Sequence, residues 1–126
     1  MAWEVVIADE FRIELDSLSP SVQTELAASA KMLAEFGPSL GRPKVDTLNG
    51  SHYANMKELR FDADGGTWRI AFAFDPRRKA ILLVAGDKSG GSQQRFYKEL
   101  IRKADTCFAR HLSQIPKGGT KDVKEP

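Results

Sequence analysis

The fold of this chain is decided by two neighbouring stretches, residues 56–61 (MKELRF) and residues 67–74 (TWRIAFAF). In each stretch large apolar side chains alternate with charged or small ones, which is the pattern of a β-strand with one buried face. In the first stretch, Glu58 and Arg60 fall on the face opposite the apolar residues. In the second, Arg69 points away from its large neighbours. The sequence therefore predicts two strands that each carry charge on one face.

Turn-forming residues separate these strands, because Asp and Gly tolerate the positive φ angles of tight reversals. If Asp62 pairs with Thr67 across the turn, every large apolar residue of both strands falls on one face. Arg60 then lies directly opposite Arg69. A pairing shifted by one residue would place Arg60 opposite Trp68 and mix charge into the apolar face, so we reject it.

A second turn is expected at residues 75–78 (DPRR), where Pro suits the second position of a type I turn. We expect Phe74 to pair with Lys79 across it. Carried to the end of the third strand, the same register places Lys88 on the face of Arg69. The third strand itself is apolar at every position, which is typical of a central strand covered on both faces.

Four charged residues are thus predicted to line one concave face of the sheet: Glu58, Arg60, Arg69 and Lys88. Two arginines directly opposite each other repel, at a cost of some tenths of a kcal/mol to about 1 kcal/mol. An anion would offset that repulsion, and phosphate matches the planar fork of arginine best. The alternative interpretation is an ordinary solvated face, since antiparallel sheets commonly expose one face to water.

The remaining segments predict an α+β fold in a single domain. We expect a strand at residues 3–7, two amphipathic helices divided at Ser19 and Pro20, a connecting loop over 39–55, and a helix over about 92–112. The order is N-terminal strand, helical hairpin, three-stranded antiparallel meander and C-terminal helix, with the hairpin packed on the apolar face of the meander. The domain is expected to span 1–113, followed by a disordered tail over 114–126.

Composition limits the classes of function. The chain has 126 residues and a net charge of +2, so any nucleic-acid surface must be a local basic patch. The single cysteine, Cys107, excludes an internal disulfide and is expected in the core. His52 and His111 are far apart in sequence, so no metal-ligand spacing exists and we expect no metal or other cofactor. Without a signal peptide or a membrane-helix pattern, the expected location is the cytoplasm.

Several short motifs in a fixed order make the chain similar to a known family. They are residues 40–43 (LGRP), 48–50 (LNG), 56–60 (MKELR), 68–74 (WRIAFAF), 82–88 (LLVAGDK) and 94–97 (QRFY). With this element order, the chain resembles the RelE/ParE superfamily of bacterial toxins, and its HigB-like branch in particular.

The resemblance implies a toxin of a type II toxin-antitoxin system. One branch of the superfamily comprises ribosome-dependent mRNA endonucleases and another poisons DNA gyrase. The implied partners are a cognate antitoxin with a helix-turn-helix domain, the ribosome and mRNA, with no membrane. The family's site positions correspond to Lys57, Glu58, Arg60, Arg69 and Lys88, although Glu58 replaces a basic residue of several members, and Asp87-Lys88 replaces a histidine of some.

Metal-independent RNA cleavage needs a base for the 2′-hydroxyl proton, an acid for the 5′-oxygen and cations for the developing charge. Glu58 is the best candidate for the base, and we expect its arginine neighbours to keep it ionised. Arg69, Lys88 and Arg60 would supply the cations. We expect that changing Arg69 to Ala removes activity without loss of stability, because its small neighbours do not shield it.

Four other residues have weaker cases. Lys57 points to the opposite face, Tyr97 could stack on a base or act as the acid, and His52 could reach the site as an acid. For Tyr97 and His52 a purely structural role is the alternative. His111 is expected at the surface of a helix C-terminus. Besides the endonuclease, two functions stay open: a non-catalytic toxin that binds a protein such as gyrase, and a mobile-element protein that has lost its activity.

Overall fold

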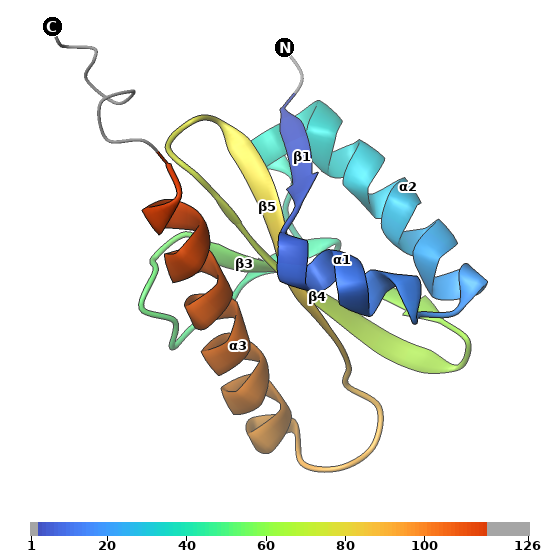
Figure 1. Cartoon of the computed structure of the whole chain (residues 1–126). Helices are drawn as coiled ribbons and strands as arrows, with labels where there is room; N and C mark the ends of the chain where they lie inside the picture. Colours follow the sequence, from blue (N-terminus) through green and yellow to red (C-terminus); the bar gives the residue numbers. More distant parts are fainter. Residues whose placement is uncertain (1–2, 116–126) are drawn as a thin grey trace, which may run out of the picture.

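The computed structural model describes residues 3–115 and contains one five-stranded sheet with helices on both faces (Figure 1). Its elements in chain order are β1 (Glu4–Ile7), α1 (Asp9–Asp16), α2 (Pro20–Phe36), a short 3-10 helix η1 (Gly37–Ser39), β2 (Val45–Thr47), β3 (Met56–Ala63), β4 (Gly66–Phe74), β5 (Lys79–Asp87) and α3 (Gln93–Ser113). The strand order is β1-β5-β4-β3-β2, with β1 parallel to β5 and all other neighbours antiparallel. The predicted α+β class is confirmed.

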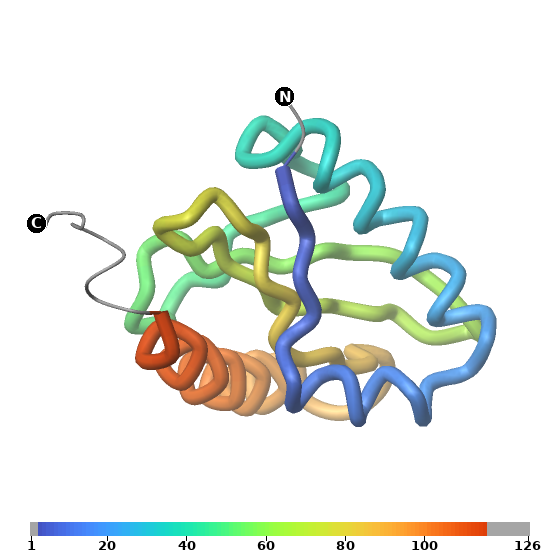
Figure 2. The backbone as a smooth tube through the Cα atoms, turned by 45° about the horizontal axis from the view of Figure 1, so that its top comes forward, coloured from blue at the N-terminus to red at the C-terminus, as the bar shows by residue number. Residues whose placement is uncertain are grey.

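The helical hairpin and the C-terminal helix lie on different sides of the sheet and meet at its edge, where Glu10 of α1 forms an ion pair with Arg110 of α3. Helices α1 and α2 pack on one face, chiefly against β5 and β3, while α3 crosses the other face over β4 and β5 (Figure 2). The apolar stripe of α3 is buried at Leu100, Ala104, Cys107 and Phe108. The hairpin therefore covers the apolar face as predicted, and α3 covers much of the face that carries the charges.

Local chemistry explains the bounds of α2. The Ser19 hydroxyl accepts a hydrogen bond from the backbone N–H of Val22 at 3.3 Å, and Pro20 occupies the first turn, where no N–H is needed. The helix ends at Gly37, which has a φ of +55°. The Trp3 indole packs so closely there that a Cβ would collide with it. Glycine is therefore required at this helix end, both by its backbone angle and by the packing.

The register between β3 and β4 is the predicted one. Asp62 pairs with Thr67, and Arg60 pairs with Arg69. Alternation on both strands fixed this pairing, since only one register places every large apolar side chain on the same face.

The register between β4 and β5 differs from the prediction. Phe74 pairs with Ala80 rather than Lys79, and the ladder skips Leu83, a β-bulge that shifts the pairing beside Ala71 and Phe72. Because β5 is apolar at every position, its pattern contains no information about which face each residue occupies.

Lys88 still lies next to the predicted strand end. Beyond the bulge Arg69 pairs with Gly86. Because side chains alternate along a strand, the position two residues after Gly86, that of Lys88, falls on the same face as Arg69. Lys88 itself follows β5, and its backbone N–H donates to the carbonyl of Thr67 at 2.6 Å.

The predicted loop over residues 39–55 contains a strand that the sequence analysis missed. Strand β2 pairs with β3 and places Asp46 directly opposite Glu58. Three residues are too few for a hydrophobic alternation to stand out, so pairing with β3 determines this strand.

At the C-terminal end, α3 stops at Ser113 and the next residues turn back on it. The Ile115 N–H bonds to the carbonyl of Leu112, and the Ile115 side chain is buried. The boundary after residue 113 stays a prediction, and the tail over 116–126 lies outside the described residues. Within residues 3–115, no helix is long and apolar enough to cross a membrane.

Candidate functional site

The face of the sheet beneath α3 is divided into an apolar and a charged part. Met56, Ala71 and Ala73 are completely buried at one end. At the other end, the alternation of β3 and β4 brings Glu58 and Arg60 to the same face as Arg69. The three charged side chains therefore start from adjacent positions of two paired strands.

Arg69 is held from three sides and is largely inaccessible. Its Nε donates to the hydroxyl of Tyr97 at 3.2 Å and lies 3.7 Å from Glu58 Oε1, while its Nη1 donates to the Trp68 carbonyl at 2.9 Å. Only 7% of the side chain is exposed. The expectation that Arg69 stands unshielded between small neighbours is wrong, because α3 covers it. Replacing Arg69 would leave Glu58 buried without this cation, so a loss of stability is now expected.

Arg60 lies between two carboxylates. Its Nε is 3.8 Å from Glu58 Oε2, and its Nη1 is 3.9 Å from Asp46 Oδ2. Asp46 also lies 3.9 Å from the Nε of Arg42, a largely exposed residue. We call Asp46, Glu58, Arg60 and Arg69 the charge cluster. Its two acids and two bases alternate in space, so the cluster is close to neutral when both acids are ionised.

Glu58 is a buried carboxyl with few hydrogen-bond donors. The residue is 5% exposed, and its Oε1 accepts no hydrogen bond. Burial raises the pKa of Glu58 above its ordinary value; Tyr97 and then the two arginines lower it, and the Asp46 charge adds to the rise. Burial outweighs the cations and raises the pKa, whereas the arginine neighbours alone would lower it; that they keep Glu58 ionised stays a prediction.

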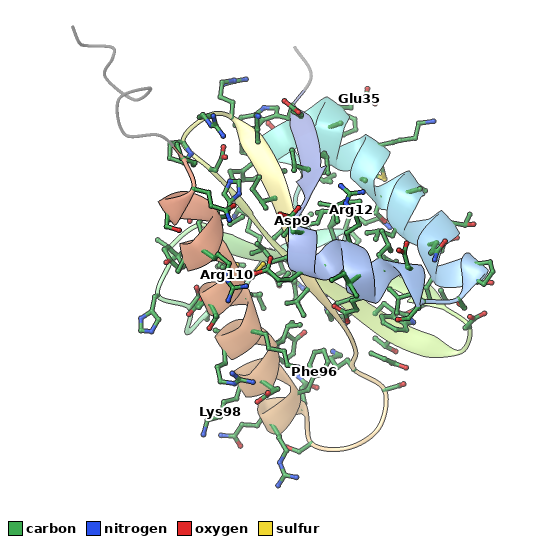
Figure 3. All side chains as sticks on the ribbon, viewed as in Figure 1. Asp9, Arg12, Glu35, Phe96, Lys98 and Arg110 are labelled. Atoms are coloured by element: carbon green, nitrogen blue, oxygen red, sulfur yellow. The ribbon has the colours of Figure 1, made fainter. Side chains whose placement is uncertain are left out.

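Tyr97 connects the charge cluster to α3. Its hydroxyl accepts a hydrogen bond from Arg69. The centroid of its ring lies 5.8 Å from the Lys88 Nζ, in cation–π range, and the ring packs edge-on against Phe96. Burial raises the pKa of Tyr97. Figure 3 marks Phe96 beside the first turns of α3. A Cβ on Gly86 would lie 2.7 Å from the Phe96 ring, so Gly86 permits this close packing.

Two of the predicted site residues lie elsewhere. Lys57 alternates with Glu58 and therefore points to the opposite face of β3. His52 is exposed, and its backbone N–H bonds to Asp105 of α3 at 3.0 Å. Asp105 is about two helical turns beyond Tyr97, or roughly 12 Å along the axis. The structure thus assembles Glu58, Arg60, Arg69, Lys88 and Tyr97 and leaves Lys57 and His52 outside.

A second buried carboxylate was not anticipated. Asp75, in the turn between β4 and β5, accepts hydrogen bonds from the backbone N–H groups of Arg77 at 2.9 Å and Lys79 at 3.0 Å. Its other oxygen lies 2.9 Å from His111 Nε2. We call Asp75 and His111 the clasp. The sequence analysis expected His111 at the surface of a helix C-terminus. Instead its side chain contacts Asp75 and ties α3 to the sheet.

The clasp has the opposite electrostatic character to the charge cluster. Burial alone would raise the pKa of Asp75, but the bonds from His111, Lys79 and Arg77 outweigh it and lower the pKa. Sequence spacing gave no signal for this contact, since its partners are 36 residues apart.

The charge cluster defines the chemistry available at this face. Two arginines and a nearby lysine can bind a phosphodiester, and a carboxyl and a phenol can exchange protons with it. The fold that carries this face is RelE-like: the structure of a double mutant of the E. coli toxin RelE in the free state superposes with a TM-score of 0.56. At 13% identity, covering 80% of this chain and 99% of that one, this match shows the fold alone.

Sequence comparisons show the family. The model of the phage derived protein Gp49-like family matches residues 13–109. Two curated relatives come from Mycobacterium tuberculosis: the putative toxin HigB2, 47% identical over 111 residues, and the putative toxin HigB3, 42% identical over 103 residues. The matches cover 86% and 82% of this chain. The chain spans about half the length of the first relative (55%) and 88% of the second.

The chain belongs to the Gp49-like family, together with HigB-like toxins, and has the fold of RelE. The resemblance seen in the sequence motifs is thereby confirmed.

Proposed function

We propose that the protein is the toxin of a toxin-antitoxin system and acts as a ribosome-dependent, metal-independent mRNA endonuclease. The observation that carries the proposal is the pair of cross-strand arginines, Arg60 and Arg69, with Glu58 between them and Tyr97 above. Such a like-charge pair is unfavourable unless anions offset it, and it sits where an RNA phosphate can meet cations and proton-transfer groups together.

In this reaction the RNA 2′-oxygen attacks the adjacent phosphorus and the bond from phosphorus to the 5′-oxygen breaks. Arg60, Arg69 and Lys88 stabilise the negative charge that develops on the phosphate oxygens. One well-placed donor of this kind contributes about 3 to 4 kcal/mol to the transition state. Glu58 and Tyr97 are the groups that exchange protons with the RNA. The products are a 2′,3′-cyclic phosphate and a 5′-hydroxyl.

The proposed partners follow from this role. A cognate antitoxin, which we expect to carry a helix-turn-helix domain, neutralises the toxin in the cytoplasm, and the ribosome presents the mRNA. A ribosome requirement agrees with the modest net charge of +2, because so weakly basic a chain would bind free RNA poorly.

Mapping of reporter mRNA after induction tests the proposal. We expect cuts that depend on translation and end in 2′,3′-cyclic phosphates. Arg60→Ala should slow cleavage by about a hundredfold or more. Lys57→Ala is the matched control, since Lys57 is a cation on the same strand that faces away, and it should cleave like wild type.

A non-catalytic toxin that binds DNA gyrase is the second candidate. Two observations favour it: the charge cluster is nearly neutral, and both histidines of the chain lie away from it. Intact transcripts together with accumulating gyrase-linked DNA breaks would select this function over the endonuclease.

A further inference from the structure

The charge cluster is nearly neutral in the free protein, although its arginines are what a phosphate would need. Glu58 lies 3.7 Å from Arg69 and 3.8 Å from Arg60, and Asp46 lies 3.9 Å from Arg60. Each arginine is thus already beside a carboxylate. A phosphodiester that binds here must compete with these acids for the same guanidinium groups.

The two acids differ in how easily each can break its ion pairs with the arginines and move into water. Asp46 has 40% of its side chain exposed, so it can turn to water and remain ionised. Glu58 is 6% exposed and sits in the middle of a strand. It faces Arg60 on its own strand, Asp46 across from β2, Arg69 from β4 and Tyr97 from α3. Its carboxylate therefore has little room to turn to water as Asp46 can.

An ionised Glu58 beside a bound phosphate would be electrostatically unfavourable. The phosphate and Asp46 would both repel it, while the phosphate would draw the arginine charge away. Burying a carboxylate without compensation costs more than neutralising it, so such groups take up a proton instead.

From this arrangement, which rests on the proposed function of the site, we propose that an RNA phosphodiester binds the charge cluster together with one proton, which Glu58 takes from solvent to become a neutral carboxyl. The oxygen of Glu58 that accepts no hydrogen bond in the free protein is compatible with this, since a neutral carboxyl tolerates burial. Binding of the anion and protonation of Glu58 then strengthen each other.

The bound proton also assigns Glu58 a role in cleavage. In place of the base expected from the sequence, Glu58 enters the reaction as the acid. The 2′-oxygen forms its bond to phosphorus and loses its proton to water. The bond from phosphorus to the 5′-oxygen breaks, and the Glu58 proton passes to that oxygen, which regenerates the carboxylate.

Calorimetric titration of the full chain with a 2′-O-methylated oligouridine tests the inference. This probe cannot be cleaved, because its nucleophile is blocked, and its phosphodiesters keep one charge each over the working pH range. In buffers of different ionisation enthalpy, we expect uptake of about one proton per bound oligonucleotide. Above the pKa of Glu58, the affinity should fall by about tenfold for each pH unit.

Two variants locate the proton. Glu58→Gln should bind at least about tenfold more tightly than wild type in mild alkali and lose the steep pH dependence. Asp46→Asn is the matched control: it should bind about twofold to fivefold more tightly, as for an exposed ion pair, and keep the wild-type slope.

The outcomes separate this inference from the proposed function. Binding by wild type that takes up no proton, or a wild-type slope that persists in Glu58→Gln, overturns the inference and leaves the endonuclease proposal standing. Failure of the wild-type protein to bind the free oligonucleotide at any pH overturns the inference, and failure in the presence of ribosomes as well contradicts both. The wild-type pH series alone decides the inference if a variant fails to fold.

Discussion

The charge cluster and the clasp each contain a buried carboxylate beside a basic side chain, yet the two carboxylates have opposite properties. Glu58 has two arginines within 4 Å and a raised pKa, whereas Asp75 has one histidine and a lowered pKa. The difference lies in hydrogen bonds. Asp75 receives two backbone N–H bonds and the histidine contact, while one oxygen of Glu58 receives none.

Nearby positive charge therefore does not by itself keep a buried acid ionised. Directed N–H donors replace the water that burial removes, and a guanidinium nearly 4 Å away replaces it only in part. The clasp is built to hold a permanent charge and to fasten α3. The charge cluster instead contains a carboxylate whose pKa is raised by burial.

The largest expected effect is on the clasp. Asp75→Ala removes the acceptor for two backbone N–H groups and His111, and should lower the free energy of unfolding by about 3 kcal/mol. The lowered pKa means that this stabilisation is present above the ordinary Asp pKa and is lost as the pH falls through the folded-state pKa. Denaturant unfolding across acid pH measures it. Asp62→Ala, which removes an exposed carboxylate, should stay within about 0.5 kcal/mol of wild type.

An intermediate effect is expected at Arg69. Arg69→Ala leaves Glu58 buried with one cation fewer and should cost about 2 kcal/mol near neutral pH. The penalty should shrink in acid, because a protonated Glu58 needs no partner. Melting curves at several pH values provide the test, with Arg60→Ala as a more exposed control. A penalty that is constant with pH would mean that Arg69 stabilises the fold through packing alone.

The smallest effect on stability is expected at Glu58. The raised pKa of Glu58 means that folding favours its protonated form. Its contribution to the free energy of unfolding is therefore present below the ordinary Glu pKa and is lost as the pH rises through the folded-state pKa. Glu58→Gln should therefore gain on wild type as the pH rises, by less than about 1 kcal/mol. Paired unfolding curves measure the difference, and an opposite trend would mean that the arginines outweigh burial.

The sequence predicts that Glu58, Arg60 and Arg69 share one face because apolar and polar residues alternate clearly in β3 and β4. Leu59 and Phe61 on one strand match Ile70 and Trp68 on the next, and only one register places them all on one face. That register alone brought Arg60 opposite Arg69.

The sequence did not reach the features that need three-dimensional contacts. The bulge at Leu83 lies in a strand without alternation, so the pairing of β5 could not be predicted. Asp46 was missed because β2 is too short to be recognised, and the clasp because its residues meet only after α3 has packed. The burial of Glu58 was underestimated for the same reason, since Tyr97 and α3 cover it.

Carbon-13 NMR titration of the side-chain carboxyls of Glu58 and Asp75 in one sample measures the contrast between these two buried acids. We predict that Glu58 titrates above the ordinary range for glutamate and Asp75 below that for aspartate. A Glu58 that titrates at or below its ordinary value would show that its arginines hold it ionised, and would contradict the account of a carboxyl poised to take up a proton.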